Sequence, residues 1–170
     1  MSDSRKTKGG RVQSGALKQA ARAHASVDYV GAENVGSENV GAENVSAEKV
    51  KEAGVTALKT VLKILDKWDC SSEQAQAILR LPKATYYRYK AKPELANITG
   101  DLLERLSYLL NIHASLRTVF SNPENLYGFM QMPNNNDYFN GESPIKVLES
   151  GSFASLYEVF KRVDALKGAS

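Results

Sequence analysis

Helical spacing of the apolar residues is the feature that most constrains the fold of this 170-residue chain. From Thr56 onward, apolar side chains recur every three or four positions, which places them on one face of an α-helix. Prolines divide this pattern into segments, and three helices have candidate N-caps, namely Ser71 or Ser72, Thr99 and Ser143. No segment has the strict alternation of a half-buried β-strand, so the expected fold class is all-α. Helices are predicted over residues 56–69, 73–79, 84–91, 99–120 and 124–130, then from Ser143 up to Gly151, and finally from Ser152 onward.

A five-residue repeat sets the N-terminal third apart from the rest of the chain. The unit Val30-Gly31-Ala32-Glu33-Asn34 is followed by three close copies, the last of which ends at Lys49. A step of five residues turns an α-helix by about 140° beyond one full turn, so the valines do not form a stripe. Each repeated glycine also costs about 1 kcal/mol relative to alanine in a helix. We therefore expect residues 1–52 to be a mostly disordered arm.

Composition excludes several classes of protein. No apolar run reaches the roughly 18 residues of a transmembrane helix, and the polar residues 1–8 do not resemble a secretory signal, so we expect a cytoplasmic protein with no membrane partner. The single cysteine, Cys70, cannot form an internal disulfide, and no Cys/His cluster suggests a zinc site. His24 lies in the expected arm, and His113 lies late on an apolar helix, where a structural role is the simpler interpretation. We expect no catalytic residue, no metal and no cofactor.

The segment from Ser72 to Ala91 has the length of a helix-turn-helix, in which two short helices pack at a steep angle. Gln76 and Arg80 depart from the usual pattern, because alanine and glycine are common at those two positions. The positions that such a motif buries are nonetheless all apolar or aromatic here: Ala75, Leu79, Leu81, Tyr86 and Tyr89.

Charge favours DNA as a partner of this segment. Residues 51–100 carry nine Lys and Arg against five Asp and Glu, whereas residues 121–170 carry four against six. A basic excess suits phosphate contacts, and outward Arg and Lys side chains suit the edges of bases in the major groove. The competing interpretation is a helical hairpin with a solvated basic face. The predicted DNA-binding residues are Lys83, Thr85, Tyr87, Arg88 and Lys90.

Two stretches resemble one known family. Residues 81–89, Leu-Pro-Lys-Ala-Thr-Tyr-Tyr-Arg-Tyr, resemble the recognition-helix signature of Xre/ParS/MbcA-type antitoxins. Residues 122–166 resemble the small C-terminal domain of that family, with an aromatic stretch after Asn-Pro, then Phe-Asn-Gly-Glu-Ser-Pro-Ile-Lys-Val-Leu, then a terminal helix. Near Phe129 and Met130 the family usually carries tryptophan, and this chain does not. The resemblance covers about residues 56–168.

The resemblance implies a function. Such proteins are the antitoxins of type II toxin–antitoxin pairs, and their partner is a RES-domain toxin that consumes NAD⁺. The antitoxin forms a homodimer and higher complexes with the toxin, obstructs the toxin's active site through its C-terminal domain, and represses its own promoter. The toxin-binding residues that the resemblance implies are Gly141, Pro144, Phe153, Leu156, Phe160, Lys167 and Gly168.

The expected organisation is therefore an arm over residues 1–52, a DNA-binding domain over residues 53–120 and a toxin-binding domain over residues 121–170. For the apolar residues of the last helix, packing within the core or a dimer explains the pattern as well as toxin contact does. Two other functions stay open. One is a stand-alone helix-turn-helix regulator without a toxin, and the other is an adaptor in which the repeats are the working part.

Overall fold

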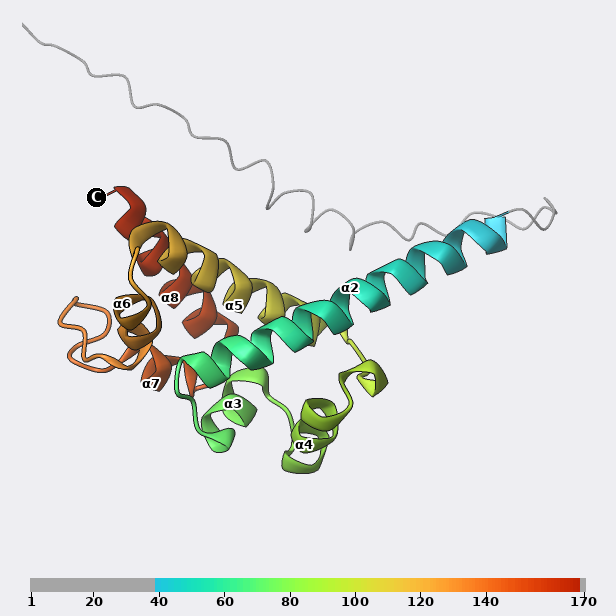
Figure 1. Ribbon diagram of the computed structural model, residues 1–170, viewed down its shortest axis with the longest axis horizontal. Coiled ribbons are helices and arrows are strands. Elements are labelled where there is room, and N and C mark those ends of the chain that lie inside the picture. The colour runs from blue at the N-terminus through green and yellow to red at the C-terminus, as the bar shows by residue number, and fades with distance from the viewer. Residues whose placement is uncertain (1–38, 169–170) are drawn as a thin grey trace, which may run out of the picture. The chain divides into compact units, whose positions relative to one another are not determined.

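The computed structural model describes the backbone of residues 39–168 and the side chains of residues 47–168. Within that part of the chain every regular element is a helix, which confirms the predicted all-α class (Figure 1). The elements are α2 (Asn39–Lys67), α3 (Ser72–Leu79), α4 (Lys83–Ala91), η2 (Pro93–Leu95), α5 (Gly100–Val119), α6 (Pro123–Gly128), η3 (Phe129–Gln131), α7 (Pro144–Leu148), α8 (Phe153–Ala165) and η4 (Leu166–Gly168).

Helix α2 begins at Asn39, so the prediction of disorder is wrong for residues 39–52. Residues 47–53 are all exposed, and this end of α2 extends beyond the other helices (Figure 1). Once the packed half of a helix has formed, each further residue adds a hydrogen bond without a new nucleation cost. The last repeat unit also has Ser46 in place of glycine and is followed by good helix formers, so the helix continues backward. The remainder of the predicted arm, residues 1–38, lies outside the described residues.

Side-chain caps start α3, α5, α7 and α8 where the sequence predicts them. The Ser71 hydroxyl accepts a hydrogen bond from the Gln74 N–H at 3.1 Å, and the Ser71 N–H donates to the Gln74 side chain at 2.9 Å, which together form a capping box. Thr99 caps α5, Ser143 caps α7 and Ser152 caps α8, each by accepting one hydrogen bond from a backbone N–H three residues later. The helix starts are thus fixed locally, by side chains next to the backbone groups they satisfy.

Helix α5 forms the centre of the core and packs against α2 on one side and α8 on the other (Figure 1). Trp68, Leu106, Leu109 and Ile112 are fully buried where these helices meet. Burial of one such aliphatic side chain stabilises a fold by about 1.5–3 kcal/mol. The two regions predicted as separate domains, before and after residue 120, therefore share α5 and pack as one compact unit.

A buried arginine joins the helix-turn-helix to the C-terminal helices. Arg105 of α5 is 0% exposed, and its Nη1 donates to the carbonyl of Ile78 at 3.3 Å and to that of Gly151 at 2.8 Å. Its Nε donates to Asp101 at 2.9 Å, and the guanidinium lies 4.3 Å from the ring centroid of Phe153. One side chain therefore ties the end of α3 to the start of α8.

The chain turns sharply at Gly151, between α7 and α8. Its φ is +64°, and a Cβ built there would lie 2.7 Å from the carbonyl oxygen of Ala77. A residue with a side chain would clash with the α3 backbone, which cannot move as a flexible side chain would. The predicted stop at Gly151 is confirmed, and the close approach explains why glycine stands there.

Candidate nucleic-acid and partner interfaces

Helices α3 and α4 form the predicted helix-turn-helix. Its buried positions are confirmed at Ala75, Leu79, Tyr86 and Tyr89, each at most 4% exposed, while Leu81 is half-buried. The Tyr89 hydroxyl accepts a hydrogen bond from the Asn97 N–H at 3.0 Å, which anchors α4 to the segment that follows it.

The turn between the two helices uses a left-handed residue. Arg80 has φ 51° and ψ 42°, and its N–H donates to the Ala77 carbonyl at 3.2 Å. This conformation explains why glycine is common at that position, since L-residues pay roughly 1–2 kcal/mol to adopt it. Arg80 adopts this conformation despite its cost, and its side chain is exposed beside the turn.

Most of the predicted DNA-binding residues point outward from α4. Lys83, Tyr87 and Arg88 are exposed, and Thr85 is half-buried. Lys90 is exposed too, but its ammonium is paired with Asp66 of α2 at 2.9 Å, and that hydrogen bond raises its pKa. An exposed ion pair of this kind contributes little to stability. Lys90 can therefore leave Asp66 and bind a phosphate instead. The structure therefore gathers a basic and aromatic surface on one helix.

The predicted toxin-binding residues do not share one surface. Gly141, Lys167 and Gly168 are exposed, whereas Phe153 and Phe160 are half-buried. Leu156 is 1% exposed and Pro144 is also buried, so these two side chains pack within the fold. The most buried positions of the apolar stripe on α8 are Leu156, Val159 and Val163, which face the core.

The exposed face of α8 was missed by the sequence reasoning. Tyr157 is 46% exposed and lies about 100° around the helix from the buried Leu156, off the core face of α8. Tyr108 of α5 is half-buried nearby, and burial raises its pKa, with Glu104 and Tyr157 adding to the effect. The only signal in the sequence was the helical register, which places Tyr157 off the apolar stripe.

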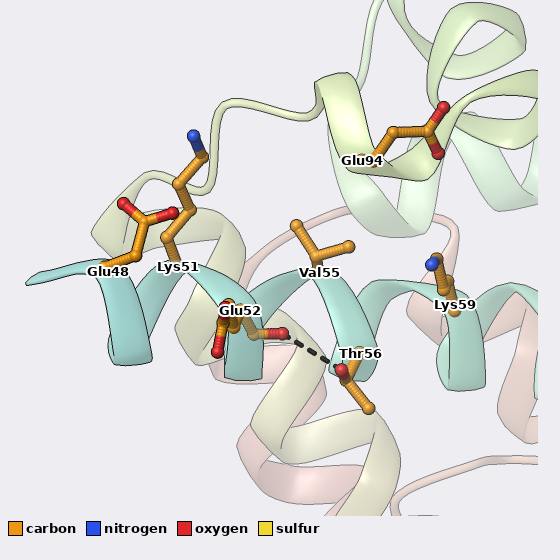
Figure 2. Close-up of a pocket in the computed structure, with 7 residues that line it drawn as sticks. All are labelled: Glu48, Lys51, Glu52, Val55, Thr56, Lys59 and Glu94. Carbon is orange, nitrogen blue, oxygen red and sulfur yellow. Dashed lines mark hydrogen bonds between the residues drawn. The ribbon is translucent and has the colours of Figure 1, made fainter.

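No arrangement suited to catalysis is present in the described part of the chain. A depression of about 420 Å³ lies between α2 and η2 (Figure 2), where the hydroxyl of Thr56 donates to the backbone of Glu52 at 3.0 Å. Its walls are mostly charged side chains without a nucleophile and base in contact. It is lined by Glu48, Lys51, Glu52, Val55, Thr56, Lys59 and Glu94.

The reactive side chains that the sequence raised have packing roles. Burial raises the pKa of the Cys70 thiol to about 12, with nearby carboxylates adding to the effect, so the thiol stays protonated. The His113 ring stacks on Tyr127 with centroids 6.0 Å apart, and burial lowers its pKa. Residues 47–168 contain no group of three or more potential metal ligands.

These features define a helical DNA-binding protein of the helix-turn-helix class with a second helical region built onto it. Residues 52–111 match the antitoxin Xre-like helix-turn-helix domain, and residues 115–168 match the antitoxin Xre/MbcA/ParS C-terminal toxin-binding domain. The chain belongs to the Xre/MbcA/ParS antitoxin family. It is thus a DNA-binding antitoxin of a toxin–antitoxin system and not an enzyme.

A curated relative is similar to about two thirds of this chain. The uncharacterized protein y4oB of Sinorhizobium fredii (strain NGR234) is 29% identical over 112 residues, which are 65% of this chain and 84% of that protein.

Among the helices of residues 39–168, none has both the length and the apolar character needed to cross a membrane.

Proposed function

We propose that this antitoxin binds and blocks a RES-domain toxin that consumes NAD⁺, and that it represses its own operon by binding promoter DNA. The observation that carries the proposal is the presence, in one compact unit, of an exposed basic helix and of a segment that matches a toxin-binding domain. A steric block of the toxin by α8 is the simplest mechanism, because it needs no chemistry from this chain.

The DNA-binding part of the proposal assigns roles along α4. In helix-turn-helix proteins the second helix lies in the major groove, so its exposed side chains can contact base edges and phosphates. Arg88 is exposed and suited to a bidentate contact with guanine, while Lys83 and Tyr87 suit phosphate contacts. Thr85 and Lys90 lie at the edges of this surface, with Lys90 leaving Asp66 when it binds.

A homodimer is part of the proposal. Helix-turn-helix proteins gain affinity by placing two recognition helices on half-sites about one DNA turn apart. Val50 of α2 and Leu95 of η2 are 54% and 58% exposed, which leaves apolar surface outside α4 for such an association. A cytoplasmic location follows from the promoter as a target.

Promoter binding tests the DNA-binding part. Arg88→Ala is expected to weaken binding to the operon's own promoter fragment roughly 5–150-fold, the value of one bidentate base contact. Arg117→Ala is the matched control, because it removes the same exposed charge from the last turn of α5. If Arg88→Ala binds the promoter as well as the wild type does, the assignment of α4 as the recognition helix is contradicted. An equal loss of promoter binding in Arg88→Ala and Arg117→Ala would contradict it too.

A further inference from the structure

The outer face of α8 carries a large aromatic side chain that the fold leaves partly uncovered. Tyr157 is 46% exposed in the middle of a helix that buries Leu156, Val159 and Val163 in the core. The helix is therefore held rigidly while the tyrosine stays available to a partner. The other exposed residues of this face are small or charged: Ala154, Lys161 and Ala165.

The two flanks of this face differ. On one flank Arg162 is paired with Glu158, and its guanidinium lies 3.9 Å from the ring centroid of Tyr138, so that flank is covered by the loop before α7. On the other flank the half-buried Phe160 contacts Tyr108 of α5, with ring centroids 6.1 Å apart. The open surface therefore runs from Tyr157 toward α5, where a second tyrosine continues it.

The match to a toxin-binding domain narrows the choice of contact residues. It spans residues 115–168, and within that segment the exposed large hydrophobic side chains are Met132 and Tyr157. Met132 follows the short helix η3 at the start of a loop, whereas Tyr157 lies on a helix anchored by the core. Rigid aromatic anchors lose little entropy on binding, and tyrosine is enriched among the residues that dominate interface energies.

We propose that the toxin docks on a tyrosine face made of Tyr108, Ala154, Tyr157 and Lys161, with the ring of Tyr157 as its main anchor. The partner that fits is a protein surface with an apolar pocket for that ring and an acidic rim for Lys161. This inference rests on the proposed function. On α8 it moves the contact from the predicted apolar residues to the exposed side of the helix.

The test compares two tyrosines of equal exposure. Tyr157 and Tyr87 are 46% and 45% exposed, and they lie on α8 and α4. The probe is the purified product of the neighbouring gene, titrated against the full-length antitoxin. Tyr157→Ala should weaken this binding by at least about 30-fold and leave promoter binding within twofold. Tyr87→Ala should leave toxin binding unchanged.

Further variants keep the test decisive. Met132→Ala should bind the toxin like the wild type, and Lys161→Glu should weaken binding by about tenfold while changing only an exposed charge. The tyrosine face is overturned if Tyr157→Ala binds the toxin within threefold of the wild type. It is also overturned if Tyr87→Ala loses as much toxin binding as Tyr157→Ala does. Failure of the wild type to bind the neighbouring product overturns the proposed toxin instead. Point variants are needed because deletion from Pro144 onward removes core residues of α7 and α8.

Discussion

Replacement of Arg105 by alanine is the substitution that tests how the two halves of the molecule are joined. The side chain is fully buried, and one of its nitrogens donates to the carbonyls of Ile78 and Gly151. Alanine would leave both carbonyls without that donor and would open a cavity beside Phe153. We expect the fold to survive, since the α2–α5–α8 core is apolar, but with a much lower free energy of unfolding.

The magnitude follows from those contacts. An unsatisfied buried carbonyl costs about 1–3 kcal/mol, and a large-to-small change in a core costs about 2–5 kcal/mol. Release of a buried charge to water offsets part of this loss. A net destabilisation of about 4 kcal/mol is the expected result, equivalent to a decrease in Tm of roughly 12–20 °C for a unit of this size.

Chemical denaturation followed by tryptophan fluorescence measures this quantity directly. Trp68 is the chain's single tryptophan and is 0% exposed, so its emission reports the core. Asp101→Asn is the control: it keeps an oxygen acceptor for Arg105 at a side chain that is 53% exposed, and it should cost clearly less than Arg105→Ala because the carbonyls of Ile78 and Gly151 keep their donor. A loss below about 1 kcal/mol in Arg105→Ala would refute the reasoning, because the buried hydrogen bonds would then contribute nothing.

Two further predictions follow from the packing. Gly151→Ala should destabilise the fold by at least about 2 kcal/mol through its positive φ and the clash with Ala77, whereas Gly168→Ala, with no atom within 4 Å of its new Cβ, should change thermal stability little. Because burial lowers the pKa of His113, the unfolded chain binds a proton that the folded chain resists, so stability should fall as the pH drops from 7 toward 5.5. Over this pH range the midpoint of denaturation should shift less in His113→Phe than in the wild type. A wild-type midpoint that rises on acidification would contradict the lowered pKa of His113.

Features that depend on neighbouring residues along the chain were predictable from the sequence. The caps at Ser71 and Thr99 and the stop at Gly151 are examples, because each side chain or backbone conformation acts within one turn of its own helix. The buried positions of the helix-turn-helix were predictable for the same reason, since their spacing is fixed by two short helices. The core of α2, α5 and α8 follows from the apolar stripe that each helix carries.

Features that depend on distant contacts or on cooperativity were not predictable. The repeat composition argued against a helix over residues 39–52, but the packed half of α2 supplies the nucleus that those residues lack by themselves. The complete burial of Arg105 depends on the carbonyls of Ile78 and Gly151, which are far away in the sequence. On α8, periodicity located an apolar stripe without telling whether the core or a partner covers it.

A growth-rescue assay tests the central claim most directly. The neighbouring gene is expressed under tight control, with and without this antitoxin, while growth and cellular NAD⁺ are followed. The account predicts that the neighbour arrests growth and depletes NAD⁺, and that co-expression of the antitoxin restores both. A harmless neighbour, or an arrest that the antitoxin does not relieve, would contradict the account and leave a DNA-binding regulator without that toxin as its partner.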